Sequence, residues 1–412
     1  MANRFADGCF RLAVGIEDTF VPQAYLGQRA LDEYELTQHY DRWAEDLGMA
    51  RECGATTIRY GIPWYKVNPS PNRFVWDWLD RVVDRLDELG LETIADLMHY
   101  GTPLWLDNQF LNNAYPERVA EYAARVAERY HGRLTAFTPF NEPLTNAIYC
   151  GEIARWPPHL SGDDGFVKLV RALVRGIVAT QAAVAELTGG DATFVHVEAT
   201  MRYVHEGEDV PEEVAFLRGR SFLIEDLLTG GVDDAHPLAD FLRRNGFDDD
   251  DFAWCREHVA QPEVMGINYY PHLSTFAHRA GEPRESWPQV DAGTTGLGEV
   301  VRAFADRYRV PVFLTETSAT GSIAERARWL DTSIEFLLRL RDEGVDIAGY
   351  TWWPLFDLVD WVYREETGPV EDYLLSMGMY DLRVSEIGRL DRVQTAVVDR
   401  FQSHAQSLMA AR

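Results

Sequence analysis

The stretch Phe137-Thr138-Pro139-Phe140-Asn141-Glu142-Pro143 is the starting point for interpreting this chain. It is a β-branched and aromatic run that ends in an amide, a carboxylate and a proline, which is typical of a buried strand carrying polar groups at its C-terminal end. A second short apolar run, Val312-Phe313-Leu314-Thr315-Glu316-Thr317, also ends at a carboxylate. Carboxylates so far apart in the sequence can face each other only across a closed barrel or a sheet crevice. Such pairs serve acid–base catalysis.

Eight short apolar segments alternate with amphipathic helical patterns along the chain. The predicted strands span residues 11–17, 55–60, 92–98, 134–140, 193–199, 263–269, 310–316 and 346–353. Helices are predicted over 77–90, 116–130, 166–187, 297–308 and 322–343, and the insert 200–262 is expected to carry two more, around 211–228 and 237–257. This alternation favours an α/β fold with a single (β/α)8 TIM barrel and long βα loops, spanning residues 1–412 as one domain, over a doubly wound sheet.

The charge of the chain excludes several classes of partner. With a formal net charge of −27 and a pI near 4.7, the protein's own field repels nucleic acid, polyphosphate and anionic membranes, whereas neutral ligands meet no such barrier. Lys66 and Lys168 are the only lysines, and no GxxxxGK[ST] phosphate loop is present. We therefore expect a neutral small-molecule ligand and no cofactor.

The four cysteines and the N-terminal residues bear on the compartment. Cys9, Cys53, Cys150 and Cys255 lie far apart without a CxxC pair, which favours a reducing compartment over a disulfide framework or a zinc knuckle. The first residues hold no apolar signal segment, and nowhere do 18 apolar residues run together. We expect a cytoplasmic protein without a membrane span, and a homo-oligomer stays possible.

Polar and aromatic side chains gather at the predicted strand ends, where a barrel of this kind carries its chemistry. They are Glu17, Arg59, His99, Asn141, Glu142, Glu198, Asn268, Tyr269, Tyr270, Glu316, Trp352 and Trp353. Each alone has an ordinary structural explanation as an ion pair, a buried histidine or packing. Their coincidence at one end of the barrel indicates a site.

Six motifs surround these residues in order along the chain. They are Ile58-Arg59-Tyr60-Gly61-Ile62-Pro63-Trp64, Met98-His99-Tyr100, Phe140-Asn141-Glu142-Pro143, Gly266-Ile267-Asn268-Tyr269-Tyr270, Leu314-Thr315-Glu316, and the run from Gly349-Tyr350-Thr351-Trp352-Trp353 to Asp360-Trp361. With these motifs the chain resembles glycoside hydrolase family 1, the β-glucosidase type of retaining glycosidase, whose barrels carry the acid/base after strand 4 and the nucleophile after strand 7.

The resemblance implies a role for each matching residue. Glu316 would be the nucleophile, kept ionised because Arg59 and a hydroxyl from Tyr269 or Tyr270 hold its pKa down. Glu142 would be the acid/base, protonated at the start because of the charge on Glu316. The sugar would be bound by Asn141 at its 2-hydroxyl, by His99 at a further hydroxyl and by the indole face of Trp353.

Three positions depart from the family pattern. Asp360-Trp361 stands where the family has Glu-Trp, so the reach to the far hydroxyls of the sugar changes. The strand 1 glutamine is missing, and Gln23, Glu17 or Asp18 would have to replace it. The nucleophile motif reads Thr-Glu-Thr-Ser without the family's Asn-Gly. These departures leave the sugar open, although Asp360 and the scarcity of lysine oppose a 6-phosphorylated one.

The leading hypothesis is a retaining exo-β-glycosidase that cleaves a small-molecule glycoside by double displacement, with transglycosylation as a further option. An endo-acting glycanase of a related barrel family and a catalytically silent carbohydrate-binding barrel remain as alternatives. No metal is expected, because His196 and Glu198 form a His-x-Glu pair without a third ligand at a suitable spacing.

Overall fold

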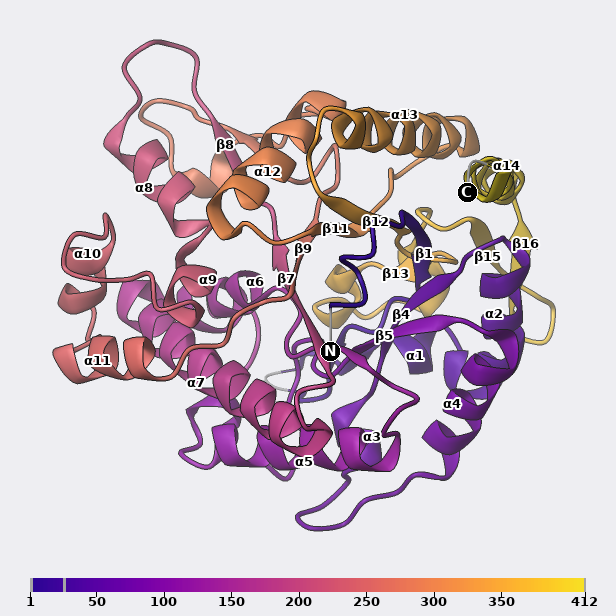
Figure 1. The fold of residues 1–412 in the computed structure, drawn as a ribbon, viewed down its shortest axis with the longest axis horizontal. Coiled ribbons are helices and arrows are strands. Elements are labelled where there is room, and N and C mark those ends of the chain that lie inside the picture. Colours follow the sequence, from indigo (N-terminus) through magenta and orange to yellow (C-terminus); the bar gives the residue numbers. More distant parts are fainter. Residues whose placement is uncertain (1–2, 25–26, 411–412) are drawn as a thin grey trace.

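The computed structural model describes residues 3–24 and 27–410 and contains a closed barrel of eight parallel strands (Figure 1). Each strand pairs with the next barrel strand along the chain, and the first pairs with the last. The barrel strands are β1 (Arg11–Gly15), β4 (Thr57–Gly61), β5 (Glu92–Asp96), β6 (Ala136–Thr138), β7 (Thr193–Ala199), β9 (Val264–Asn268), β11 (Val312–Thr317) and β12 (Ile347–Trp352). All eight predicted strands and the TIM barrel are confirmed.

Long helices surround the barrel (Figure 1). They are α2 (His39–Glu52), α4 (Asp77–Leu89), α5 (Tyr115–Arg129), α7 (Gly162–Thr188), α12 (Gly293–Tyr308), α13 (Ile323–Asp342) and α14 (Ala396–Ala410). In α4, Leu79, Val82, Val83 and Leu86 recur at helical spacing and are buried, and Gly90 ends the helix in the left-handed conformation. The five helices predicted outside the insert are confirmed, and α7 begins four residues before its predicted start.

The interior of the barrel is filled by small and branched side chains. Besides Phe5, this buried cluster draws on seven of the eight barrel strands, and side chains from so many strands can meet only inside the barrel. Phe313 of β11 lies beside Gly349 of β12, where a Cβ would come within 2.4 Å of the phenyl ring. This part of the barrel interior is therefore packed with apolar side chains.

The insert between β7 and β9 differs in detail from the prediction. It holds β8 (Arg202–Val204), α8 (Glu212–Arg220), α9 (Leu223–Leu228), α10 (Ala239–Arg244) and α11 (Asp249–Glu257). Each of the two expected helices is thus divided. The second is interrupted at Gly246, whose φ of +93° ends a helical path, and the chain restarts at Asp248, which caps α11 reciprocally with Asp251. The acidic run is a helix start, as predicted.

Several short elements lie outside the predictions. They are β2 (Phe20–Val21), β3 (Leu31–Asp32), α1 (Glu33–Leu36), α3 (Trp64–Val67), η1 (Gln109–Leu111), α6 (Pro143–Ala147), η2 (Ile148–Glu152), β10 (Thr275–Ala277), η3 (Arg284–Ser286), β13 (Leu358–Val359), η4 (Trp361–Arg364), η5 (Val370–Tyr373), β14 (Leu374–Leu375), β15 (Tyr380–Val384) and β16 (Leu390–Gln394). β15 and β16 form an antiparallel hairpin, which a buried ion pair of 2.8 Å between Arg392 and Asp46 attaches to α2.

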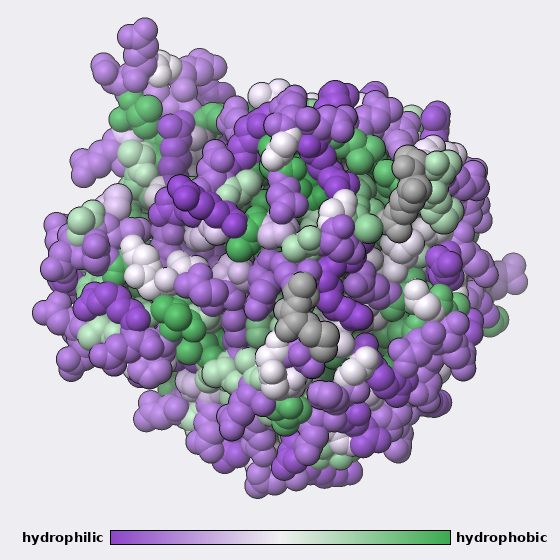
Figure 2. Space-filling model, in the orientation of Figure 1, coloured by the Kyte–Doolittle hydropathy of each residue, from purple (hydrophilic) through white to green (hydrophobic). Residues whose placement is uncertain are grey.

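The face shown in Figure 2 is mostly hydrophilic, with hydrophobic residues scattered among polar ones. Within residues 3–24 and 27–410, none of the helices combines the length and the apolar character that a bilayer crossing would need. All four cysteines are unpaired, and Cys53, Cys150 and Cys255 are buried.

Candidate active site

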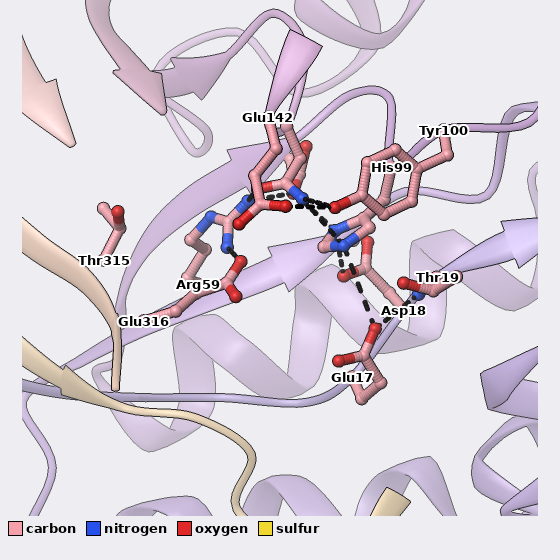
Figure 3. Close-up of polar contacts among 12 residues, drawn as sticks. Glu17, Asp18, Thr19, Arg59, His99, Tyr100, Glu142, Thr315 and Glu316 are labelled. Atoms are coloured by element: carbon pink, nitrogen blue, oxygen red, sulfur yellow. Dashed lines mark hydrogen bonds and ion pairs between the residues drawn. The ribbon is translucent and has the colours of Figure 1, made fainter. Parts of the chain in front are cut away.

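The two glutamates singled out from the sequence lie at one end of the barrel (Figure 3). Glu316 belongs to β11, the seventh barrel strand. Glu142 follows β6, the fourth, and precedes the first residue of α6 with a φ of +46°, an uncommon conformation for a residue with a side chain. Glu142 is 8% exposed and Glu316 is 4% exposed. Both carboxyl groups are therefore largely withdrawn from water.

Arg59 of β4 connects the two sides of the site. Its Nη1 donates to Glu316 Oε1 at 2.5 Å, and its Nη2 donates to Asn141 Oδ1 at 2.7 Å and to Asp96. The guanidinium is fully buried, so these acceptors take the place of water. Arg59 therefore fixes Glu316 and Asn141, which are far apart in the sequence, relative to each other.

A tyrosine holds the second oxygen of Glu316. Tyr270 donates its hydroxyl to Glu316 Oε2 at 2.7 Å. Its neighbour Tyr269 was an equal candidate from the sequence, but its hydroxyl donates to the Gly293 carbonyl at 2.8 Å and its ring packs near Trp329. Consecutive residues of an extended chain point to opposite sides, so only one of the pair reaches the site. Tyr269 is therefore not the tyrosine that holds Glu316, and its contact with substrate stays a prediction without support from these hydrogen bonds.

Both oxygens of Glu142 also accept hydrogen bonds. Tyr100 donates to Oε2 at 2.5 Å, and the amide nitrogen of Asn268 donates to Oε1 at 2.8 Å. Thr315 fixes Asn268 by donating to its amide oxygen at 2.8 Å. Asn268 is at a predicted strand end and Tyr100 is in the Met98-His99-Tyr100 motif, but the sequence alone indicates no role for either.

Burial dominates the protonation of Glu316. It raises the pKa of Glu316 to about 8, with the nearby charge of Glu142 acting in the same direction and Arg59 acting against it. The prediction that Arg59 and a tyrosine hold this pKa down is therefore wrong in its balance. The sequence identifies the partners of Glu316 but not how completely the carboxyl group is removed from water.

His99 lies among acidic side chains. Its Nδ1 is 2.8 Å from Asp18 Oδ1 and 3.1 Å from Asp96 Oδ2, while Asn141 Nδ2 approaches its Nε2 at 2.9 Å. The oxygen of the Asn141 amide is engaged by Arg59, so its nitrogen meets Nε2. Burial acts to lower the pKa of His99, but the charges and hydrogen bonds of Asp18 and Asp96 raise it well above its ordinary value, so Nδ1 carries a proton. Asn141 and His99 thus reach each other at the strand ends.

Asp18, Asp96 and His99 are also close enough to one another to hold a metal ion. Their distances are those of hydrogen bonds, and Arg59 already supplies a positive charge to Asp96. Burial raises the pKa of Asp18 to about 6, so negative charges on Asp18 and Asp96 at the same time are disfavoured. The donor set therefore works as a hydrogen-bonded cluster that fixes His99.

The His196 and Glu198 pair considered from the sequence is divided between other partners. His196 lies 3.0 Å from Glu225 and 2.7 Å from Gln181. Glu198 instead accepts a hydrogen bond from the backbone nitrogen of Leu144 at 3.3 Å.

Trp353 lies beside the site and is fully buried. Its indole nitrogen donates to Glu17 Oε2 at 2.8 Å, and its ring is near-parallel to that of His99 at 5.8 Å between centroids. Arg59 lies 4.8 Å from the centre of the indole. A Cβ on Gly15 would come within 1.9 Å of the indole, so only glycine fits there. Glu17 is thus a residue of this site through Trp353.

The remaining predicted residues lie on loops. The amide nitrogen of Gln23 donates to Thr102, so Gln23 is occupied by the neighbouring loop. Asp360 caps η4 by accepting from the Val362 backbone nitrogen at 3.0 Å. Trp361 packs against Tyr100, Tyr149 and Trp156 at centroid distances of 5.6, 6.0 and 5.1 Å. Gln23 as a replacement for the strand 1 glutamine has no support in this arrangement.

Buried carboxyl groups after the fourth and seventh strands of a (β/α)8 barrel, joined by an arginine and an asparagine, define the class of barrel glycosidases that work with two carboxylates. Residues 14–196 match the model of glycosyl hydrolase family 1. A β-glucosidase from Agrobacterium sp. is 34% identical over 375 residues, which cover 81% of this chain and 80% of that enzyme.

More distant relatives agree with this match. A bifunctional β-D-glucosidase/β-D-fucosidase from Bifidobacterium breve is 25% identical, covering 79% of this chain and 80% of that protein. The structure of a Thermotoga maritima β-glucosidase in complex with deoxynojirimycin superposes with a TM-score of 0.79 at 19% identity, covering 99% of each chain, and so shares the fold. The chain belongs to glycosyl hydrolase family 1 and is a retaining β-glycosidase acting on O-glycosyl bonds.

Proposed function

We propose that this chain is an exo-acting β-glucosidase-like enzyme, with Glu316 as nucleophile and Glu142 as acid/base. The observation that carries the proposal is the pair of buried carboxyl groups held by separate sets of donors. Arg59 and Tyr270 hold Glu316, whereas Tyr100 and Asn268 hold Glu142. Each glutamate thus has its own environment, as two different roles require.

The first step forms a bond between Glu316 and the anomeric carbon of the sugar. The glycosidic bond breaks, its electron pair stays on the leaving oxygen, and Glu142 protonates that oxygen. Arg59 and Tyr270 orient the attacking carboxylate. To Asn141, which Arg59 holds beside it, we assign the contact with the 2-hydroxyl, which strengthens as positive charge develops on the sugar ring.

The attacking carboxylate of Glu316 must carry a negative charge. Burial raises the pKa of Glu316 to about 8, with the nearby charge of Glu142 acting in the same direction and Arg59 acting against it. Arg59 at 2.5 Å and the hydroxyl of Tyr270 stabilise the negative charge that Glu316 needs for the attack.

The second step releases the sugar. Glu316 is now an ester without charge, and Glu142, which has given up its proton, takes one from an incoming water. The water oxygen bonds to the anomeric carbon, and the bond to Glu316 breaks. An acceptor alcohol in place of water would give transglycosylation.

Exo action is supported by contacts that close one side of the site. The loop after β6 meets the loop after β12 where Tyr149 and Trp156 pack on Trp361, and Arg155 pairs with Glu365 at 2.6 Å in the same region. A site closed by such contacts suits the end of a chain better than its middle. The acidic residues Glu17, Asp18 and Asp360 favour a neutral sugar over a phosphorylated one.

The test is hydrolysis of aryl β-glycosides by wild type, Glu316→Gly and Glu142→Gly, with azide added to each variant. We expect loss of turnover in both, with azide giving the α-glycosyl azide in the first variant and the β-glycosyl azide in the second. Undiminished turnover in either variant would remove that assignment. Cleavage inside a polysaccharide would instead favour the endo alternative, and sugar binding without cleavage by wild type would favour the silent barrel.

A further inference from the structure

Tyr100 has an unusual backbone conformation next to the acid/base. Its φ is +83°, which bulky side chains rarely adopt, and it is one residue beyond His99. Gly101 donates to the Phe20 carbonyl at 2.7 Å, and Asn146 donates to the Tyr100 carbonyl at 3.2 Å. A Cβ on Gly101 would come within 2.3 Å of the Phe20 oxygen. The surroundings thus hold Tyr100 in a strained conformation, as is common at functional sites.

The side chain of Tyr100 is fixed on all sides. Its ring packs against Trp156 at 5.0 Å, Trp361 at 5.6 Å and His99 at 4.8 Å between centroids, and it is buried. Its hydroxyl oxygen accepts from Asn141 Nδ2 at 3.1 Å. A tyrosine hydroxyl has one proton to donate, and this proton goes to Glu142 Oε2 at 2.5 Å (Figure 3).

We propose that Tyr100 is a positioning residue for the acid/base, which orients Glu142 and stabilises the carboxylate that forms as Glu142 gives its proton to the leaving group. The inference rests on the proposed role of Glu142. It adds a residue to which sequence analysis assigned no role, and it explains why a strained tyrosine is kept at this position.

We expect Tyr100 to act in the first step of the reaction, when Glu142 gives up its proton. The O–H bond of Glu142 breaks, the proton moves to the leaving oxygen, and the electron pair stays on a carboxylate that receives the hydrogen bonds of Tyr100 and Asn268. Both bonds stabilise the negative charge that develops on Glu142. Substrates with poor leaving groups depend most on this acid, whereas those with good leaving groups depend on it little.

The experiment compares Tyr100→Phe with Tyr122→Phe, which removes another buried tyrosine hydroxyl, one that donates to the Ile62 carbonyl at 2.6 Å. For Tyr100→Phe we expect kcat/KM to fall about 10- to 100-fold on alkyl glucosides and less than about threefold on dinitrophenyl glucosides. Tyr122→Phe changes neither quantity. Equal losses on both substrate classes would overturn the proposal.

A double-mutant comparison tests whether Tyr100 acts through Glu142. In the Glu142→Ala background, Tyr100→Phe should cause no further loss, whereas a role independent of Glu142 predicts a second loss of the same size. Full activity of Glu142→Ala would show that the proposed function fails, and an inactive Glu142→Ala beside an unaffected Tyr100→Phe would overturn this inference alone. If Tyr100→Phe does not fold, 3-fluorotyrosine at position 100 keeps the ring and strengthens the donor. The kcat/KM on alkyl glucosides then rises relative to that on dinitrophenyl glucosides, and an unchanged ratio counts against the proposal.

Discussion

The strand ends and the surrounding loops of this site behave differently. At the strand ends, Arg59, Asn141 and Glu316 form one hydrogen-bonded unit with short distances and little exposure. On the loops, Gln23 is engaged by Thr102 and Asp360 caps a short helix. Strand pairing in the barrel thus brings Arg59, Asn141 and Glu316 together. On the loops, local contacts decide which side chains remain available to bind a sugar.

The largest effect is expected from Arg59→Met, which breaks the unit at the strand ends. It leaves Asp96 and Glu316 buried without their partner, so we expect a loss of about 3–5 kcal/mol in the free energy of unfolding. The fall in kcat should reach at least about 10³-fold, because the nucleophile loses its orientation. Denaturant unfolding and steady-state kinetics measure the two effects.

Arg392→Met is the matched control, because Arg392 is buried in an ion pair with Asp46 away from the strand ends. It should cost similar stability without changing kcat per folded molecule. Equal catalytic losses in both variants would mean that the unit has no special part in catalysis.

The next effect concerns pH and the hydroxyl of Tyr270. Because burial raises the pKa of Glu316 to about 8 and the proposed nucleophile must be ionised, kcat/KM of wild type should rise as pH increases toward about 8. Tyr270→Phe removes a donor to the charged Glu316, which raises its pKa, so this limb moves to higher pH and kcat falls about 10- to 100-fold. Profiles of kcat/KM from about pH 5 to about pH 10 measure the shift.

Tyr269→Phe serves as control for Tyr270→Phe, because it removes a neighbouring hydroxyl that is bound to the Gly293 carbonyl. An unmoved limb in Tyr270→Phe, or an identical shift in both variants, would contradict the contact with Glu316 as the cause.

A smaller effect is expected on the loops, from Asp360→Glu. The longer carboxylate matches the family's residue, so the ratio of kcat/KM between aryl glycosides that differ at C4 or C6 should change about tenfold. Asp360→Asn, which keeps a capping oxygen for Val362, separates the effect of charge from that of length. Unchanged ratios in both variants would place Asp360 outside sugar selection.

The smallest effect is expected from Gln23→Ala. Since the amide of Gln23 is held by Thr102, kcat/KM should stay within about twofold of wild type. Glu17→Gln, at the residue that holds the indole of Trp353, should cost more. A loss above about tenfold for Gln23→Ala would show that this loop residue binds sugar after all and would weaken the comparison.

The eight repeated strands, and the residues that the barrel gathers at the strand ends, could be predicted from the sequence. All eight strands follow from short apolar runs, and Glu142 and Glu316 follow because both end such runs in a fold that gathers strand ends. Membership of glycosyl hydrolase family 1 is also confirmed. The cytoplasmic location, a homo-oligomer and the assignment of residues 1–412 to one domain stay predictions.

What the sequence does not reveal depends on contacts between distant parts of the chain. The sequence does not distinguish Tyr269 from Tyr270, because only the folded backbone decides which of the two side chains points toward the site. Tyr100 belongs to the Met98-His99-Tyr100 motif, but the sequence does not show that its hydroxyl donates to Glu142, which directly precedes α6. The raised pKa of Glu316 depends on how completely the folded chain buries its carboxyl group. The divided helices of the insert depend on local breaks such as Gly246.

The ion pair of Arg59 has a consequence for how the barrel assembles. Arg59 stands on the second barrel strand and Glu316 on the seventh, with Asp96 and Asn141 contributed by the third and fourth. Before the seventh strand joins the barrel, the guanidinium of Arg59 lacks its ion pair with Glu316. Docking of the late strands therefore gains this ion pair, so the contact that orients the proposed nucleophile also helps to close the barrel.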